Sequence, residues 1–105
     1  MVSTESVIIK KLDEAFSPIY LEVINESALH NVPDGSESHF KVIIVSQSFK
    51  GQSPVKRHQS VYEVLAAELQ TGVHALALHT YLLVEWEKQK TVPKSPNCMG
   101  GSSEP

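Results

Sequence analysis

Apolar residues recur along the first half of the chain with the spacing of a helix and then of strands. A helical stripe over about Thr4–Phe16, with a serine or threonine available as N-cap and Pro18 beyond it, predicts a first helix. In Ile19–Asn25, Leu21 and Val23 share one face, and the segment is rich in β-branched residues. In His39–Ser46, Phe40, Val42 and Ile44 share one face opposite Lys41 before the pattern becomes apolar on both faces. We therefore expect two strands that pair as an antiparallel hairpin.

The second half of the chain repeats this change from helix to strand. Ser53 and Pro54 are of the types preferred at the N-cap and first position of a helix, and Gly72 ends the apolar pattern that follows. A strand is expected from Val73 and a short final helix over Leu82–Lys90. The residues expected to pack inward are Val55, His58, Val61, Tyr62, Leu65, Ala66 and Leu69 on the long helix, and Leu83 and Trp86 on the last one.

The order helix, strand, strand, helix, strand, helix predicts an α+β fold, in which helices cover one face of a three-stranded mixed sheet. Because the last strand follows a helical crossover, it can run parallel to a strand of the antiparallel hairpin. Residues 1–90 form a single predicted domain, and the proline, glycine and serine content of residues 91–105 is typical of a disordered tail. The segment Glu26–Ser38 is a long loop rich in turn formers, and loops of this length are often functional.

Composition and charge limit the classes of protein that remain. With 105 residues and 41% hydrophobic content, the chain can build one core. Its formal charge of −3 is not the basic excess of a protein held on nucleic acid by phosphate contacts, although a local basic patch is compatible with it. We find neither a signal-peptide pattern nor a run of about 20 apolar residues, and expect a soluble, cytoplasmic protein without membrane association. A single cysteine, Cys98, excludes an internal disulfide.

The apolar segment Val73–His79 contains two histidines. On a strand, His74 shares a face with Leu76 and Leu78, whereas the odd-numbered residues, among them His79, lie on the other face. The two histidines therefore cannot belong to one site. The leucines are the bulkier set and are expected to face the core, so His74 lies at the rim of the core and His79 on the outer face. A rim histidine suits either a metal ligand or a hydrogen-bonded structural residue, and geometry alone favours the structural role.

The remaining histidines differ in their settings. His58 falls on the apolar stripe of the long helix, where a hydrogen-bonded core histidine is the simpler interpretation, and His39 starts a strand, where a solvated imidazole is expected. His30 is in the long loop and can swing toward the rim of the sheet. Together with His74 it offers two nitrogen donors, but two ligands do not complete a tetrahedral metal site.

A small cationic cluster surrounds the start of the long helix. Lys50, Lys56 and Arg57 gather there beside Gly51, and the free amide groups and dipole of a helix N-terminus attract anions. A phosphate or carboxylate could bind these groups, but a solvated helix start explains them equally well. Paired cysteines, hydrolase signatures and phosphate-binding loops are all lacking. The chain is therefore interpreted as non-enzymatic.

Several short motifs, spread in order over about Glu5 to Trp86, resemble the BolA family. These motifs are Ala15-Phe16-Ser17-Pro18, Leu21-Glu22-Val23-Ile24-Asn25-Glu26-Ser27, Gly35-Ser36-Glu37-Ser38-His39-Phe40-Lys41-Val42, Arg57-His58, Leu65-Ala66-Ala67-Glu68-Leu69, Val73-His74-Ala75-Leu76 and Glu85-Trp86. The resemblance, which is greatest to the bacterial branch, implies a fold similar to the class II KH domain. That fold agrees with the predicted order of elements.

The resemblance also implies a partner and a cofactor. BolA-like proteins form heterodimers with monothiol glutaredoxins, and these can share a two-iron two-sulfur (2Fe-2S) cluster. The histidine of the family's Val-His-Ala-Leu motif is a cluster ligand, which corresponds to His74, and a second ligand from the loop between the first two strands corresponds to His30. The thiolates would come from the glutaredoxin and glutathione. The resemblance thus reverses the preference that geometry gave for His74.

The rival interpretation is a DNA-binding transcriptional regulator of cell shape, stationary phase and stress, because bacterial members have been regarded as such. A KH domain grips the nucleic-acid backbone with a Gly-x-x-Gly loop, but the corresponding region here has only Gly51. The candidate contacts are Lys50, Gly51, Lys56 and Arg57, and Gln59 stands where relatives commonly have arginine. These departures and the net charge place DNA binding second. Alone, the protein is expected to be a monomer or weak homodimer.

Overall fold

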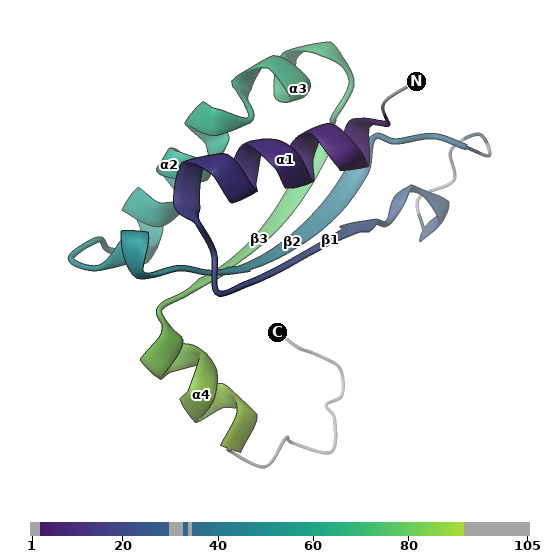
Figure 1. Cartoon of the computed structure of the whole chain (residues 1–105). Coiled ribbons are helices and arrows are strands. Elements are labelled where there is room, and N and C mark those ends of the chain that lie inside the picture. Colours follow the sequence, from purple (N-terminus) through teal and green to yellow (C-terminus); the bar gives the residue numbers. More distant parts are fainter. Residues whose placement is uncertain (1–2, 30–32, 34, 92–105) are drawn as a thin grey trace.

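A computed structural model describes residues 3–29, 33 and 35–91 of the chain. Its three-stranded sheet has the order β1-β2-β3, with β1 antiparallel to β2 and β2 parallel to β3. The antiparallel hairpin and the parallel last strand agree with the sequence prediction, which left open whether β1 or β2 is the partner of the last strand. The elements are α1 (Thr4–Phe16), β1 (Tyr20–Asn25), the 3₁₀ turn η1 (Ser27–Leu29), β2 (His39–Val45), the 3₁₀ turn η2 (Gln47–Phe49), α2 (Pro54–Val64), α3 (Ala66–Thr71), β3 (Ala75–Tyr81) and α4 (Leu83–Thr91). Helices α1, α2 and α3 lie on one side of the sheet, and α4 follows the end of β3 (Figure 1).

Both ends of α1 are capped. The hydroxyl of Ser3 accepts a hydrogen bond from the Ser6 backbone N–H (3.1 Å). The Glu37 carboxylate, from the loop before β2, accepts bonds from the first two backbone N–H groups of the helix, at 3.1 and 3.2 Å. At the other end Ser17 adopts the left-handed conformation (φ 43°), and Pro18 follows. These bonds satisfy helix-end groups that would otherwise lack partners.

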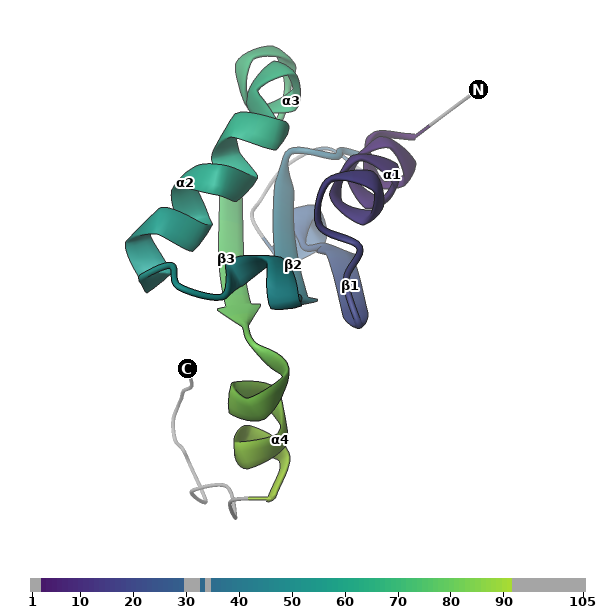
Figure 2. The same ribbon diagram turned by 60° about the vertical axis from the view of Figure 1, so that its left-hand side comes forward.

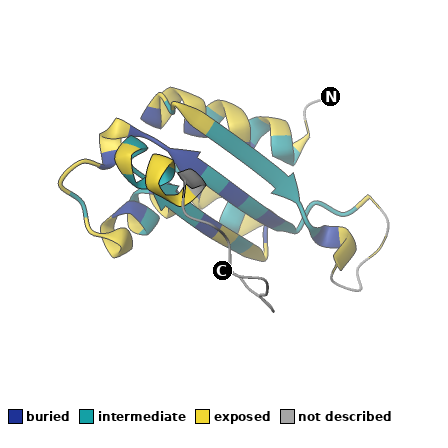
Figure 3. Ribbon diagram, turned by 90° about the horizontal axis from the view of Figure 1, so that it is seen from below, coloured by how far each residue is buried: buried dark blue, intermediate teal, exposed yellow. Residues whose placement is uncertain are grey.

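The core lies between the sheet and helices α1 and α2. Leu76 and Leu78 of β3 pack in the core, as predicted, together with Phe40, Val42 and Ile44 of β2. The exposed residues concentrate on the helices and turns rather than on the strands (Figure 3). The buried residues of this core are Ile8, Leu12, Phe16, Phe40, Val42, Ile44, Phe49, Val61, Leu65, Val73 and Leu78. Burying this apolar surface is the main favourable contribution to folding.

Val73 corrects the sequence prediction, which placed it on the outer face with the other odd-numbered residues. Only 4% of Val73 is exposed, and it belongs to the core. The reason is that β3 begins at Ala75, so Val73 lies in the turn after α3 and strand alternation does not apply to it.

The single long helix predicted up to Gly72 is two helices. The helix changes direction at Leu65, whose backbone (φ −101°, ψ 18°) departs from α-helical geometry although its N–H still bonds to the Val61 carbonyl at 3.0 Å. Leu65 itself is 1% exposed. The break keeps Leu65 in the core and redirects α3 toward α1, where the side chains of Lys11 and Glu68 meet at 2.8 Å. Figure 2 shows the two successive helices α2 and α3.

The buried face of α2 also differs from the prediction. Val55 and Tyr62, expected inside, are 65% and 41% exposed, whereas Arg57 is 6% exposed. At 100° per residue, Val55 and Tyr62 lie about 100–120° around the helix axis from Val61, which is fully buried. The apolar stripe is therefore wider than the face that the sheet covers, and the partner of Arg57, described below, explains why an arginine occupies part of that face.

A cluster of aromatic residues covers the outer face of the sheet at one end. Tyr20, Val45 and Tyr81 are register partners across the three strands. The Trp86 ring of α4 stacks on Tyr20 at 5.1 Å and lies 5.3 Å from Tyr81. Val45 is fully buried between them although it faces away from helices α1–α3. The prediction that Trp86 packs inward is therefore wrong as to the face: the ring is half-buried against the outer face of the sheet and does not belong to the core.

The last helix starts one residue later than predicted, and Leu82 before it packs against the core. The predicted tail begins at Thr91, which instead ends α4, and the rest of it, residues 92–105, lies outside the described residues. No helix in the described ranges is long and apolar enough to cross a membrane.

Candidate functional site

The sheet has two chemically different ends. We call the end where β2 and β3 begin the histidine end, because His74 directly precedes β3 there. The end where β2 and β3 finish is the arginine end, because Arg57 is buried beside it. Residues that the sequence analysis selected occur at both.

His74 combines a fixed backbone with an open side chain. Its backbone N–H donates to the Ser38 carbonyl (2.8 Å), and the N–H of Ala75 donates to the same oxygen (3.2 Å). The N–H of Val73 donates to the Glu68 carbonyl of α3 (2.9 Å). The His74 side chain is exposed, and within the described residues its imidazole makes no hydrogen bond or ion pair. The structure thus holds this imidazole at the surface, where another molecule can reach it.

Small polar residues fix the loop against which His74 is held. The buried Ser27 hydroxyl accepts bonds from the N–H groups of Ser38 (2.9 Å) and His39 (3.1 Å). Asn25 closes a turn by accepting from the Ser27 N–H, and its amide donates to the Ser36 carbonyl, both at 3.0 Å. Sequence analysis did not select Ser27. The only signal was an Asn two residues before a Ser at a strand end, a pattern of Asx turns.

The second predicted ligand, His30, lies outside the described residues, as does Cys98. His30 therefore stays a prediction. Among the residues that the structure describes, no group of three or more His, Cys, Asp or Glu side chains could hold a metal ion. A metal centre bound through His74 would need its other ligands from outside these residues.

The remaining histidines do not join His74. His39 faces its neighbour, with 2.9 Å between the Ser38 hydroxyl and Nδ1. His58 is half-buried on α2. His79 lies on the outer face, as predicted, but is half-buried rather than solvated. Burial there lowers the pKa of His79, and the nearby charges of Lys41 and His58 lower it further, against an opposing effect of Glu26.

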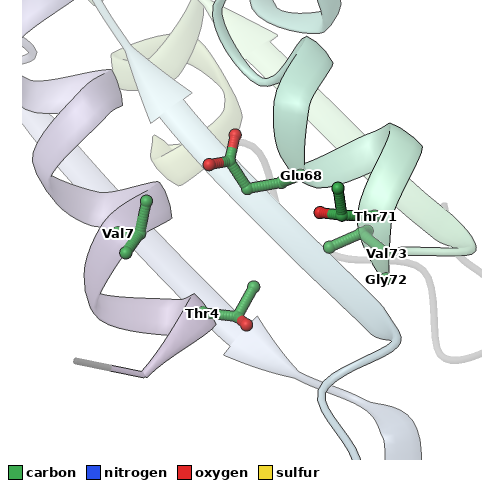
Figure 4. Close-up of a pocket in the computed structure, with 6 residues that line it drawn as sticks. All are labelled: Thr4, Val7, Glu68, Thr71, Gly72 and Val73. Carbon is green, nitrogen blue, oxygen red and sulfur yellow. The ribbon is translucent and has the colours of Figure 1, made fainter. Parts of the chain in front are cut away.

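A hollow of about 220 Å³ lies between the start of α1 and the end of α3. Figure 4 shows side chains from the two helices facing one another across it. Its lining consists of Thr4, Val7, Glu68, Thr71, Gly72 and Val73. Val73 directly precedes His74 in the chain, so the hollow lies at the histidine end of the sheet.

At the arginine end, the guanidinium of Arg57 is hydrogen-bonded to other groups of the chain. Its Nη1 and Nη2 atoms donate to the two carboxylate oxygens of Glu85, at 2.8 and 3.1 Å. Its Nε donates to the Gln52 carbonyl (3.1 Å) and Nη1 also to the Thr80 carbonyl (3.4 Å). The guanidinium carbon lies 5.9 Å from the centre of the Phe49 ring. A fork of two parallel bonds to a carboxylate is the strongest ion-pair geometry available to arginine.

Glu85 connects α4 to this network. It accepts from the Leu82 backbone N–H (2.8 Å) and so caps the start of α4 while it holds Arg57. The hydrogen bonds from Arg57 and Leu82 lower the pKa of Glu85, against a smaller opposing effect of burial. The sequence offered Glu85-Trp86 as part of a family motif but gave no role for Glu85.

The structure separates Arg57 from the other members of the predicted cationic cluster. Lys50 and Lys56 are exposed, and Gly51 has the positive φ (81°) that favours glycine. The guanidinium of Arg57 instead faces Glu85 and is not available to a phosphate in this arrangement. The exposed part of the cluster thus consists of two lysines flanking a glycine turn at the start of α2.

Comparison with known proteins places the chain in a family. The sequence profile of the family described as "BolA-like protein" matches residues 12–85. The chain is 54% identical over 99 residues to a protein of Vibrio cholerae named "DNA-binding transcriptional regulator BolA", covering 93% of each chain. It is 57% identical over 95 residues to the protein of that name from Escherichia coli, covering 90% of each.

Solved structures give the same result. The solution structure of BolA1 from Mus musculus superposes with a TM-score of 0.77 at 44% identity, over 95% of this chain and 81% of that one. The BolA domain of SufE1 from Arabidopsis thaliana superposes with a TM-score of 0.75 at 40% identity, over 81% of this chain and 98% of that one. The chain therefore belongs to the BolA-like protein family.

Proposed function

We propose that this protein is a non-catalytic regulatory and trafficking module of iron–sulfur metabolism, which pairs with a monothiol glutaredoxin and ligates a shared 2Fe-2S cluster through His74. The observation that carries the proposal is the exposed imidazole of His74 on a backbone held by Ser38 and Glu68. A structural histidine would have a partner for its ring, and His74 has none among the described residues. A ligand to an outside metal centre needs such an open donor.

The donor chemistry fits a shared cluster. His74 would supply one neutral nitrogen ligand, and His30 is the proposed second donor of this chain. The thiolates would come from the glutaredoxin cysteine and from glutathione. When bound, a cluster with imidazole in place of thiolate has a higher reduction potential than an all-thiolate cluster. Because only the neutral imidazole can ligate iron, binding through His74 would weaken as the pH falls.

A spectroscopic titration tests this proposal. The protein is added to cluster-loaded monothiol glutaredoxin and followed by visible absorption and circular dichroism. We expect a saturable spectral change that His74→Ala abolishes and that His30→Ala weakens or alters. His58→Ala is the matched control, because it removes a half-buried imidazole from α2 and should leave the change intact. An unchanged spectrum with both His74→Ala and His30→Ala would refute the ligand assignment.

DNA binding is the second candidate, since the named relatives in Vibrio cholerae and Escherichia coli are called DNA-binding regulators. Exposed Lys50 and Lys56 beside Gly51 would form the contact, at the start of α2. Arg57 would contribute only if its bonds to Glu85 opened. Two lysines predict weak binding that falls only moderately as the salt concentration rises, because the salt dependence grows with the number of phosphate contacts.

The DNA candidate is tested by measuring the affinity for duplex DNA at several salt concentrations. Substituting Lys50→Gln and Lys56→Gln together should lower both the affinity and the salt dependence, whereas Lys10→Gln on α1 serves as the charge-matched control. Affinity that persists at physiological salt with sequence preference, together with no spectral change on adding glutaredoxin, would move this candidate to first place.

A further inference from the structure

The hollow beside His74 has the chemistry of a site for a long cationic side chain. Its volume of about 220 Å³ far exceeds the about 10–15 Å³ that a single water molecule requires. Val7 and Val73 provide aliphatic walls from the two sides, and the Glu68 carboxylate lies between the two helices (Figure 4). Lysine and arginine combine an aliphatic stem with a charged head, so they can satisfy both kinds of wall together.

Glu68 is well placed to hold such a cation. Only 13% of its side chain is exposed, and its two oxygens lie 3.0 and 2.8 Å from Nζ of Lys11. Lys11 is 36% exposed, so its ammonium could leave Glu68 for water at small cost. The chain thus presents a carboxylate at the hollow that is already paired with a cation and can exchange it for another.

An anion or a purely apolar group would fit less well. The carboxylate of Glu68 repels anions, and a second carboxylate, that of Glu37, is bonded to the backbone N–H of Thr4, which lines the hollow. The hydroxyl of Thr4 and the backbone of Gly72 add polar lining that an apolar group would leave without partners.

We propose that the hollow formed by α1 and α3 receives a lysine or arginine side chain of the partner that meets His74, with Glu68 exchanging Lys11 for that cation. This inference rests on the proposed function, because it assigns the occupant to the monothiol glutaredoxin. The inference goes beyond the proposed function by naming a second contact, separate from the metal ligand, that fixes the orientation of the partner.

The test is the dissociation constant of the complex with cluster-loaded monothiol glutaredoxin, measured by calorimetry. Glu68→Gln should weaken binding about fivefold at low salt, with a smaller effect at high salt, as expected for one partly exposed ion pair. Lys11→Met removes the internal competitor and should strengthen binding. Both substitutions break the same internal ion pair, so a merely structural role would shift the affinity in the same direction for both.

A third variant blocks the hollow without changing charge. A Cβ at Gly72 would meet nothing within 4 Å, and the φ of −175° is extended backbone, so Gly72→Leu should fold and add a bulky side chain at a residue that lines the hollow. We expect binding at least tenfold weaker. The controls are Gln70→Leu and Glu63→Gln, exposed positions on α3 and α2 that should bind like the unmodified protein.

The outcomes separate this inference from the proposed function. At saturation, Glu68→Gln and Gly72→Leu should show the same cluster spectrum as the unmodified protein, because neither residue is a ligand. Equal affinities for all variants, with the spectrum still lost in His74→Ala, would overturn the hollow alone. If the free protein self-associates and Gly72→Leu abolishes this self-association, the hollow binds a second copy of the chain, and the inference is also overturned. Failure of the unmodified protein to bind glutaredoxin would overturn both proposals.

Discussion

The histidine end and the arginine end each contain a basic side chain, but within the described residues only the arginine is bonded to other groups of the chain. At the arginine end, the charged side chain is buried and every part of its guanidinium is bonded within the chain. At the histidine end, the hydrogen bonds hold the backbone around His74, and the imidazole is exposed. A residue type that suits binding therefore says little by itself, since its partners within the fold decide whether it is available.

This contrast makes a prediction about each end: substitutions at the arginine end should cost stability, and those at the histidine end should cost function. The largest loss of stability is expected for Trp86→Ala, which uncovers Val45 and removes the stacking on Tyr20 and Tyr81. Because Trp86 is only half-buried, we expect about 3 kcal/mol, the lower limit for Trp→Ala in protein cores. Urea denaturation measures it, with Trp86→Phe as a milder companion that retains part of the cover. A loss under about 1 kcal/mol would show that α4 does not protect the sheet.

A smaller loss is expected for Arg57→Ala, which removes the guanidinium donors from the carbonyls of Gln52 and Thr80 and from the Glu85 carboxylate. Since 42% of the Glu85 side chain is exposed and water can replace part of the bond, we expect about 2 kcal/mol rather than the full cost of breaking a buried ion pair. Lys56→Ala, the neighbouring exposed cation, should change the unfolding free energy by less than about 0.5 kcal/mol. If both substitutions lowered the unfolding free energy equally, Arg57 would be no more important for stability than the exposed lysines.

The pH dependence of stability sharpens the same point. Glu85 has a folded-state pKa below its ordinary value of 4.5, because the bonds from Arg57 and Leu82 favour the carboxylate. The unfolded chain therefore takes up the proton first, and the stabilisation is present above pH 4.5 and lost as the pH falls below it, through the lowered folded-state pKa. Glu85→Gln should flatten this part of the curve of unfolding free energy against pH, compared with Glu87→Gln on the exposed side of α4. Parallel curves for both variants and the unmodified protein would contradict the linkage.

The smallest stability effect is expected for His74→Ala, within about 0.5 kcal/mol, because the exposed imidazole has no partner in the described part of the chain. Thermal unfolding of the free protein checks this value. A loss above about 1 kcal/mol would restore the structural role that strand geometry first favoured for His74.

The elements and their pairing were predictable because they depend on local pattern. The cap at Ser3, the N-cap and proline at Ser53-Pro54, and the alternation along β2 are all written within a few neighbouring residues. The break at Leu65 was not, because apolar spacing continues through it and only the fit of α3 against α1 shows where the helix turns.

The candidate site was predictable only in part, for a related reason. Neither the burial of Arg57 nor its bond to Glu85 can be recovered from local pattern, because the two residues are 28 positions apart and nothing near Arg57 indicates its partner. The backbone around His74 is likewise held by two separate segments, α3 and the loop before β2, and the hollow adds a third, α1. The resemblance to a family selected His74 itself, but the hollow beside it emerges only in three dimensions.

The turn that connects α3 to β3 places one residue in the core and the next residue at the surface. Val73 is almost fully buried among the core residues, and His74 next to it is exposed. A substitution that repacks the core around Val73 would displace the Cα atom of His74 with it. Over evolutionary time, the interior of this protein is therefore not free to drift independently of its surface chemistry. Selection on the position of the His74 imidazole therefore also acts on the packing of Val73.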